Sequence, residues 1–342
     1  MDQALPPQSL PSDADLVMVL HNPRAGRRSS QRRLERFLRA IEAYGYRVEV
    51  STDLAQATEA ANRRHERGDL RCLVGLGGDG TALELINRSS PGVPLLLFPA
   101  GTSNLAASHL GISKNPQAVA QLIHDGRILR LDAGSANGRL FLVMASCGFD
   151  AAVVETVHRR RMAGYRGGHG SFLSFIGPII KLMRTYPFPE LSVTYSLDDQ
   201  SEETAIGPVA WAFVFNLPKY GWGLPLTPKA DGTDGQLDVC TFARGGVARG
   251  LWYTAVSQLA LHPGLPDCRL ARARRIRITA AEPVSYQLDG DPGGALPLEI
   301  EVLARRVQVV VPPRTAAKWK SRTLDTESVP VQAGEIRDDK PS

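Results

Sequence analysis

The chain has 342 residues, a formal net charge of +5 at pH 7 and an apolar fraction of 43%, values typical of a soluble globular protein of one or two domains. The start, MDQALPPQSLPSDAD, is acidic and proline-rich without an apolar core, so it does not resemble a secretion signal. The apolar stretch FLSFIGPIIKLM is interrupted by glycine, proline and lysine and is too short to span a membrane. The four cysteines lie far apart without neighbouring histidines, which favours neither a zinc site nor disulfides. We therefore expect a cytoplasmic protein.

The first part of the chain alternates short apolar runs with helical patterns. Leu34, Phe37, Leu38 and Ile41 share one helix face, and further helices are expected from Leu54 and over 81–88. Continuous apolar strands separated by helices indicate a parallel sheet covered on both faces, with ligands beyond the carboxyl ends of its strands. The expected strands are 16–20, 48–52, 72–76 and 93–98.

Three glycine-bearing turns follow strands of this sheet: HNPRAGRRSS, GGDGT and PAGTSN. Any one of them is explained by turn chemistry, because glycine adopts positive φ without a Cβ clash. Three at the same edge favour a phosphate-binding site, in which backbone N–H groups and a helix N-terminus face an anion. The sequence therefore predicts a nucleotide site here.

After about residue 130 the pattern becomes β-rich, and we expect a sandwich with helices only near 168–185 and 245–261. The expected strands are 191–197, 208–216, 236–242, 274–280, 298–304 and 306–311. The segment beyond Pro313 is polar and charged, which is typical of a flexible tail. The expected division is a flexible N-terminus (1–14), an α/β nucleotide-binding domain (15–132), a β-rich domain (133–313) and a polar tail (314–342).

Arginines cluster at 24–33, 159–161 and 269–277. Such clusters increase solubility, bind nucleic acid, or bind the anionic leaflet of a membrane. The chain has no zinc-finger spacing or aromatic RNA-binding motif, so we expect no nucleic-acid partner.

Six motifs in order resemble those of the diacylglycerol kinase catalytic-domain family, which includes bacterial lipid kinases and sphingosine kinases. GGDGT alone is shared with NAD kinases, but the full order is specific. The resemblance implies an NAD-kinase/diacylglycerol-kinase-like fold and phosphoryl transfer from ATP to a lipid hydroxyl, in a cleft between the two domains. The motifs are NPRAG (22–26), GGDGT (77–81), PAGTSN (99–104), ASCGFDA (145–151), PKADGTDGQLDV (228–239) and LDGD (288–291).

The resemblance also implies the site residues. Taken singly, Thr102 and Asn104 are equally explained as helix caps, and Ser51 is an alternative to Thr52. The implied nucleotide-binding residues are Asn22, Thr52, Gly77, Gly78, Asp79, Gly80, Thr81, Glu84, Gly101, Thr102 and Asn104.

A second implied site is a magnesium ion on the segment PKADGTDGQLDV, which the residues alone would make a solvated loop. By resemblance the ligands are the Asp234 side chain and the carbonyls of Asp231 and Gln236. Oxygen donors of this kind suit a hard divalent cation. We expect Mg²⁺ here to be structural or regulatory, with ATP as the other cofactor.

The implied catalytic residues are Asp291 as the general base, with Asp289 and Asp79. The family has Asp-Gly-Glu where this chain has Asp-Gly-Asp, so the side chain of the base is one methylene shorter. Asp291 can act as the base only if its carboxylate still lies within hydrogen-bond reach of the proton. Leu105 stands where the family often has aspartate, and Leu83 replaces a polar residue. These departures leave two alternatives open: a catalytically weak regulatory member that binds nucleotide or lipid, and an NAD kinase.

The acceptor is expected at the inner face of the membrane. The arginines at 159–161 suit anionic lipid, and five apolar residues are candidates for the membrane surface or equally for the core. The sequence leaves the lipid and the oligomeric state open. The five apolar candidates are Tyr165, Phe172, Phe175, Ile176 and Trp222.

Overall fold

The fold is that of a computed structural model, which describes residues 8–22, 27–101, 103–163, 179, 181–198, 202–218 and 223–326. In this part of the chain no helix is long and apolar enough to cross a membrane.

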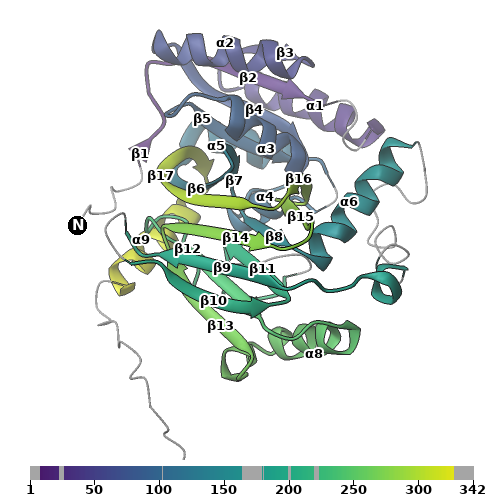
Figure 1. The fold of residues 1–342 in the computed structure, drawn as a ribbon. Coiled ribbons are helices and arrows are strands. Elements are labelled where there is room, and N and C mark those ends of the chain that lie inside the picture. The colour runs from purple at the N-terminus through teal and green to yellow at the C-terminus, as the bar shows by residue number, and fades with distance from the viewer. Residues whose placement is uncertain are drawn as a thin grey trace, which may run out of the picture.

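The N-terminal region is built on four parallel strands in the order β3-β2-β4-β5. Strands β2, β4 and β5 are buried along their whole length, because helices cover both faces (Figure 1). Helix α1 packs beside α5, and α2 beside α3. The predicted parallel sheet is confirmed. The elements are β2 (Leu16–His21), α1 (Arg27–Glu42), β3 (Arg47–Ser51), α2 (Leu54–Glu66), β4 (Leu70–Gly77), α3 (Asp79–Arg88), β5 (Pro94–Pro99), α4 (Leu105–His109) and α5 (Pro116–Asp125).

The same sheet continues into the C-terminal half of the chain. Gln308 and Val309 of strand β17 pair in parallel with β5, and antiparallel strands complete a sheet of 11 strands. Strand β6 runs through the expected domain boundary after residue 132, so the two halves share it. The added strands are β1 (Gln8–Ser9), β6 (Arg127–Ala136), β7 (Arg139–Phe141), β9 (Leu191–Ser196), β10 (Thr204–Val209), β14 (Arg275–Ala280) and β17 (Leu298–Val311).

A second sheet of six antiparallel strands has the order β13-β12-β11-β8-β15-β16. Val193 and Ile276 of the first sheet belong to the same buried cluster as Val214 and Val239 of the second, so the two sheets pack face to face. This confirms the sandwich-like second half. The strands are β8 (Met144–Cys147), β11 (Trp211–Phe215), β12 (Leu237–Phe242), β13 (Cys268–Ala273), β15 (Ser285–Leu288) and β16 (Asp291–Ala295).

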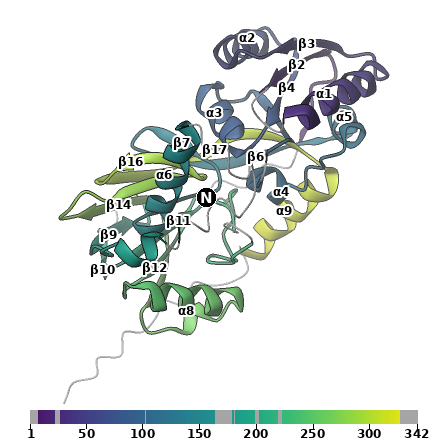
Figure 2. The same cartoon turned by 90° about the vertical axis from the view of Figure 1, so that its right-hand side faces the viewer.

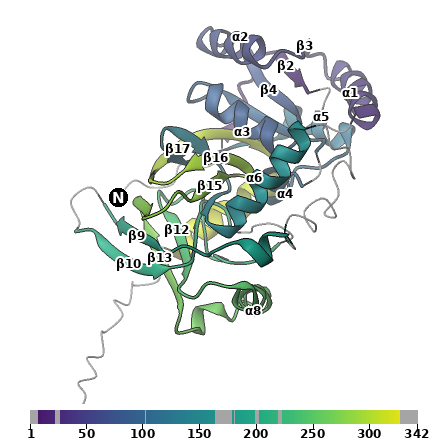
Figure 3. The same ribbon diagram turned by 45° about the vertical axis from the view of Figure 1, so that its right-hand side comes forward.

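The helices of the second half differ in part from the expectation. Helix α8 (Val247–Gln258) lies where a helix was predicted, with the short helix η1 (His262–Gly264) after it. Helix α6 (Phe149–Met162) was missed, because its valines weaken the helical signal; Figure 3 shows it running alongside β15 and β16. Most of the other predicted helix, 168–185, lies outside the described residues.

Several predicted boundaries were wrong. The predicted strand 208–216 divides into β10 and β11 around Ala210, and 298–304 and 306–311 join into β17 across an irregularity between Leu303 and Val307. Within the expected flexible N-terminus, Gln8 and Ser9 form strand β1 and Leu10 is buried.

The expected flexible tail was also wrong for its first part. Helix α9 covers Pro313–Thr326 and packs against β6 (Figure 2). Ala316 and Trp319 are three residues apart and both buried, so one apolar helix face holds this polar segment on the core. Residues 327–342 lie outside the described part.

Candidate active site

The carboxyl ends of β2, β4 and β5 bring the described residues of the first three motifs together. The backbone N–H groups of Ala100 and Gly101 donate to the Gly77 carbonyl at 2.7 and 3.2 Å, which ties the turn after β5 to the turn after β4. Asn22, just after β2, donates from Nδ2 to Thr81 Oγ1 at 3.1 Å. The structure thus gathers Asn22, Gly77, Thr81 and Gly101 at one edge of the sheet, as the sequence predicted.

Glycine is required where these two turns touch. A Cβ on Gly101 would lie 2.5 Å from the Gly78 Cα atom, and a Cβ on Gly78 would lie 3.2 Å from the Gly101 Cα atom. Any side chain would therefore push the two turns apart. The glycines serve a close backbone contact at the edge where α3 begins, beyond the needs of a simple turn.

Asp79 and Asn104 fix the geometry of this edge. Burial raises the pKa of Asp79 to about 6, against the opposing effect of the backbone N–H groups of Asn104, Leu105 and Ala106 at the start of α4. The Asn104 side chain closes its own loop, since Oδ1 accepts from Gly101 N–H at 2.9 Å and Nδ2 donates to the Gly101 carbonyl at 2.7 Å. Both side chains position backbone, and Asn104 does so from a left-handed conformation with φ 51°.

The LDGD segment forms the tip of the β15–β16 hairpin. Leu288 pairs with Asp291, and the two residues between them, Asp289 and Gly290, have φ values of 51° and 88°, as a tight two-residue hairpin turn requires. The hairpin is the most direct link between the second sheet and the nucleotide edge.

The Asp289 carboxylate anchors the tip of this hairpin. It accepts from the backbone N–H groups of Leu142, Val143 and Met144 at 2.7, 2.8 and 2.8 Å, and the Asp289 N–H donates to the Met144 carbonyl at 2.9 Å. Burial raises its pKa to about 6, against the opposing effect of these donors. We expected Asp289 among the catalytic residues; its saturated carboxylate gives it a positioning role.

Asp291 is the carboxylate that meets the nucleotide turn. Its Oδ2 atom lies 3.1 Å from the position that a Cβ on Gly80 would occupy. Its charge raises the pKa of Asp79, and the charge of Asp79 raises that of Asp289. The structure therefore brings the three predicted catalytic aspartates near one another, and Asp291 is the one whose carboxylate faces the turn at Gly80.

A polar network beneath the hairpin was not foreseen. Gln287 Oε1 accepts from Gly290 N–H at 2.7 Å, and its Nε2 donates to Ser146 Oγ at 2.8 Å. Ser146 in turn donates to Asp150 at the start of α6. Ser146 and Asp150 lie within the ASCGFDA motif, which was the available signal in the sequence. The network stiffens the tip that carries Asp291.

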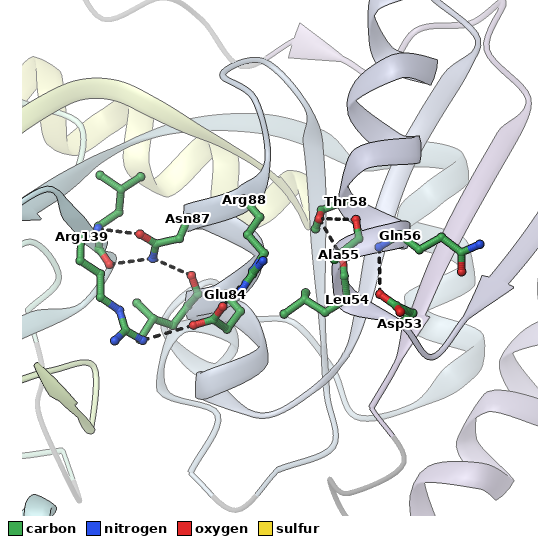
Figure 4. Close-up of polar contacts among 11 residues, drawn as sticks. Asp53, Leu54, Ala55, Gln56, Thr58, Glu84, Asn87, Arg88 and Arg139 are labelled. Atoms are coloured by element: carbon green, nitrogen blue, oxygen red, sulfur yellow. Dashed lines mark hydrogen bonds and ion pairs between the residues drawn. The ribbon is translucent and has the colours of Figure 1, made fainter.

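Two predicted nucleotide-binding residues lie apart from the turn. Glu84 forms ion pairs with Arg88 at 3.0 Å and with Arg139 of β7 at 3.2 Å, and it links α3 to β7 (Figure 4). Thr52 is exposed and precedes Asp53, which caps α2 by accepting from Gln56 N–H at 2.9 Å. Thr102 lies outside the described residues.

The predicted metal loop is held by its own hydrogen bonds and by an arginine. Asp231 Oδ1 accepts from the Thr233 N–H and hydroxyl at 3.1 and 2.7 Å. Asp234 accepts from Gln236 N–H at 3.0 Å and forms an ion pair with Arg272 of β13.

Further buried carboxylates surround this loop. Asp132 accepts from Gly235 N–H and Arg305 N–H, each at 2.7 Å. Burial raises the pKa of Asp234 to about 6 and those of Asp132 and Asp238 to about 7, and Arg272 opposes the shift for Asp234 and Asp238. This cluster of carboxylates favours a positive charge nearby, which the Arg272 guanidinium supplies.

The Asp234 carboxylate that the prediction assigns to magnesium already binds Arg272 and the Gln236 N–H. No cluster of three or more acidic, histidine or cysteine side chains in the described part of the chain is arranged to hold a metal. Magnesium on Asp231, Asp234 and Gln236 therefore stays a prediction, and no step of the proposed reaction depends on it.

Two family models match the chain. Residues 16–136 match the diacylglycerol kinase catalytic domain, and residues 143–311 match the YegS C-terminal NAD kinase beta sandwich-like domain. A diacylglycerol kinase of Mycobacterium tuberculosis is 29% identical over 245 residues, which cover 69% of this chain and 75% of that protein. A diacylglycerol kinase of Bacillus subtilis is 25% identical over 313 residues, which cover 90% of this chain and 98% of that protein.

A solved structure agrees with these matches. The crystal structure of a diacylglycerol kinase from Bacillus anthracis has a TM-score of 0.59 at 19% identity, and the match covers 89% of this chain and 98% of that one. This likeness shows the fold. The ordered motifs and the two matched models together show that the chain belongs to the diacylglycerol kinase catalytic-domain family of lipid kinases, phosphotransferases whose acceptor is an alcohol group.

Proposed function

We propose that this chain transfers the terminal phosphoryl group of ATP to a hydroxyl of a diacylglycerol-like or sphingoid lipid, with Asp291 as the general base. One observation carries the proposal: the Asp291 carboxylate from the second sheet lies against Gly80, at the start of the helix that follows GGDGT. A base must lie within hydrogen-bond reach of the proton it takes. A carboxylate at a phosphate-binding turn meets that need for a hydroxyl that attacks the bound phosphate.

The phosphate end of the site is supplied by backbone. Helix α3 has 10 residues and begins directly after β4, so its N-terminus opens at the carboxyl edge of the sheet, where a partial positive charge favours an anion. The contact between Gly78 and Gly101 fixes the turn. We assign the phosphates to residues 77–81 and 101, with Asn22 closing the pocket through Thr81.

The phosphoryl transfer forms one bond and breaks one. The lipid hydroxyl oxygen forms a bond to the terminal phosphorus, the bond from that phosphorus to the bridging oxygen breaks, and ADP leaves. The hydroxyl proton passes to an oxygen of Asp291. ATP enters with its divalent cation as part of the substrate, which offsets the charge of the three aspartates. Asp289 and Gln287 hold the hairpin so that Asp291 keeps its place.

Labelled phosphate transfer from ATP to a panel of lipids tests the proposal. We expect a labelled lipid with the wild type, none with Asp291→Asn, and wild-type labelling with Asp125→Asn, an exposed aspartate at the end of α5. NAD is included as an acceptor. Labelling of NAD in place of lipid would assign the chain to NAD kinases, and ATP binding without any transfer would assign it a regulatory role.

A further inference from the structure

Helix α8 is fixed to the second sheet by one face. Tyr253 is buried, stacks on Phe242 with ring centroids 4.2 Å apart, and donates its hydroxyl to Asp267 at 2.7 Å. Val256 is buried on the same face. Because these contacts already hold α8 on the second sheet, the helix needs no further apolar contact to stay in place.

The other face of α8 and the turn after it expose large apolar side chains. Leu251 is 61% exposed, Trp252 52%, Leu259 70% and Leu261 63%. These four make up the apolar patch, and they lie within 11 residues of sequence. A helix that is apolar on both faces, with one face in water, is typical of a surface that another phase or molecule covers.

The charge around the apolar patch is positive. No aspartate or glutamate occurs from 243 to 266, whereas Arg244, Arg249 and Arg269 are exposed beside the patch. The next acid along the chain, Asp267, already accepts from the Tyr253 hydroxyl and lies 3.7 Å from the Arg244 guanidinium. An apolar patch with tryptophan, bordered by arginines, complements an anionic lipid surface.

A second copy of the chain fits the patch less well. A two-fold contact through α8 would bring the same arginines of both copies together with no acid between them, and like charges across an interface are unfavourable. Figures 1 and 3 show α8 at the end of the molecule away from α2 and β3, projecting from the second sheet. A flat bilayer can therefore reach it.

We propose that the outer face of α8, with Leu251, Trp252, Leu259 and Leu261, docks on the surface of an anionic phospholipid bilayer. This rests on the proposed function, because the acceptor lipid resides in a bilayer. The leucines and the tryptophan enter the boundary between headgroups and acyl chains, and Arg244, Arg249 and Arg269 contact lipid phosphates. This surface differs from the one suggested by the sequence, whose apolar candidates lie outside the described residues.

Vesicle flotation tests the docking surface. We expect the wild type to float with vesicles of phosphatidylcholine and phosphatidylglycerol, and less with phosphatidylcholine alone. Trp252→Gln and Leu259→Gln should each weaken flotation roughly tenfold, since each removes a large apolar side chain from the boundary. Arg249→Gln should weaken it most at low salt. The controls at the far end of the molecule, Val50→Gln on β3 and Arg67→Gln after α2, should float as the wild type does; both residues are exposed.

Three outcomes decide between docking, dimerisation and a failed kinase assignment. Unchanged flotation of Trp252→Gln and Leu259→Gln would overturn the proposal. Unchanged flotation together with loss of a dimer in light scattering would give the patch to a second copy and overturn it too. A short-chain diacylglycerol dispersed in solution separates docking from chemistry: the patch variants should keep wild-type turnover on it and lose turnover on vesicles. Flotation that depends on the patch, without lipid labelling, would uphold docking while the proposed kinase reaction fails.

Discussion

Gly80→Ala is the substitution that most directly tests the placement of Asp291. Gly80 is the second residue of α3, where alanine favours the helix over glycine by up to about 1 kcal/mol. The new Cβ would lie 3.1 Å from Asp291 Oδ2, whereas ordinary contacts begin at 3.4 Å. The carboxylate must therefore retreat by about 0.3 Å. Since a misplacement of about 1 Å costs on the order of 100-fold in rate, a retreat of this size should cost roughly fourfold.

Two measurements separate this effect from damage to the fold. The thermal midpoint of Gly80→Ala should equal or exceed that of the wild type, while kcat with lipid falls severalfold. A rise in KM for ATP would instead place the new methyl against the phosphates. In an Asp291→Asn background, the added Gly80→Ala should lower the residual rate no further, because its effect passes through the carboxylate that is already removed.

A wild-type kcat in Gly80→Ala, together with a raised thermal midpoint, would contradict the proposed placement of Asp291. Such a result would mean that the distance between Asp291 and the start of α3 does not limit the reaction. An equal loss of rate with and without the Asp291 carboxylate would also refute it, since the methyl would then act on the nucleotide alone.

Three further predictions follow from buried carboxylates. Asp289→Asn leaves one of three backbone donors without its acceptor. It should therefore lower the free energy of unfolding, measured in urea, by about 1–3 kcal/mol and reduce turnover. An unchanged free energy of unfolding would contradict the anchoring role of Asp289. Arg272→Met removes the positive charge beside Asp234, so its melting temperature should fall and be restored by Mg²⁺, whereas EDTA should not affect the wild type. Burial raises the pKa of Asp238 from 3.8 to about 7, so its stabilising protonation is present at low pH and lost as the pH rises through 7. The melting temperature should fall from pH 6 to pH 8, and a fall of the same size in Asp238→Asn would count against this assignment.

The parallel sheet was predictable because its signal is local. Strands β2, β4 and β5 are short apolar runs, β3 alternates apolar and polar residues, and the helices between them show their own period. The continuation of the sheet was not, because the pairing of Gln308 and Val309 with β5 joins residues more than two hundred positions apart. Nothing in the composition of either segment specifies that contact.

The sequence predicted which loops form the site, but it did not predict the role of each aspartate in it. Parallel strands end at one edge, so the motifs after β2, β4 and β5 had to lie together. The sequence does not distinguish Asp79 and Asp289 from Asp291, because the role of a carboxylate depends on the donors around it. Three backbone N–H groups saturate the Asp289 carboxylate, and three others lower the pKa of Asp79 against the effect of burial. Arg272 reached Asp234 through the register of β13 on β12, which no local pattern reveals.

Two of the three departures from the family pattern, Asp291 and Leu105, fit one another in the structure. Asp291 is shorter than the usual glutamate, but the anchored hairpin brings it against Gly80, a residue without a side chain. A longer side chain would have to fold back from that contact. Leu105 contributes only its backbone N–H toward Asp79 and packs its side chain against the core. A carboxylate there would add a further negative charge beside Asp79, whose pKa the charge of Asp291 already raises. A short base held against Gly80, with one acid fewer beside it, is therefore a consistent arrangement for a carboxylate that faces a phosphate-binding turn.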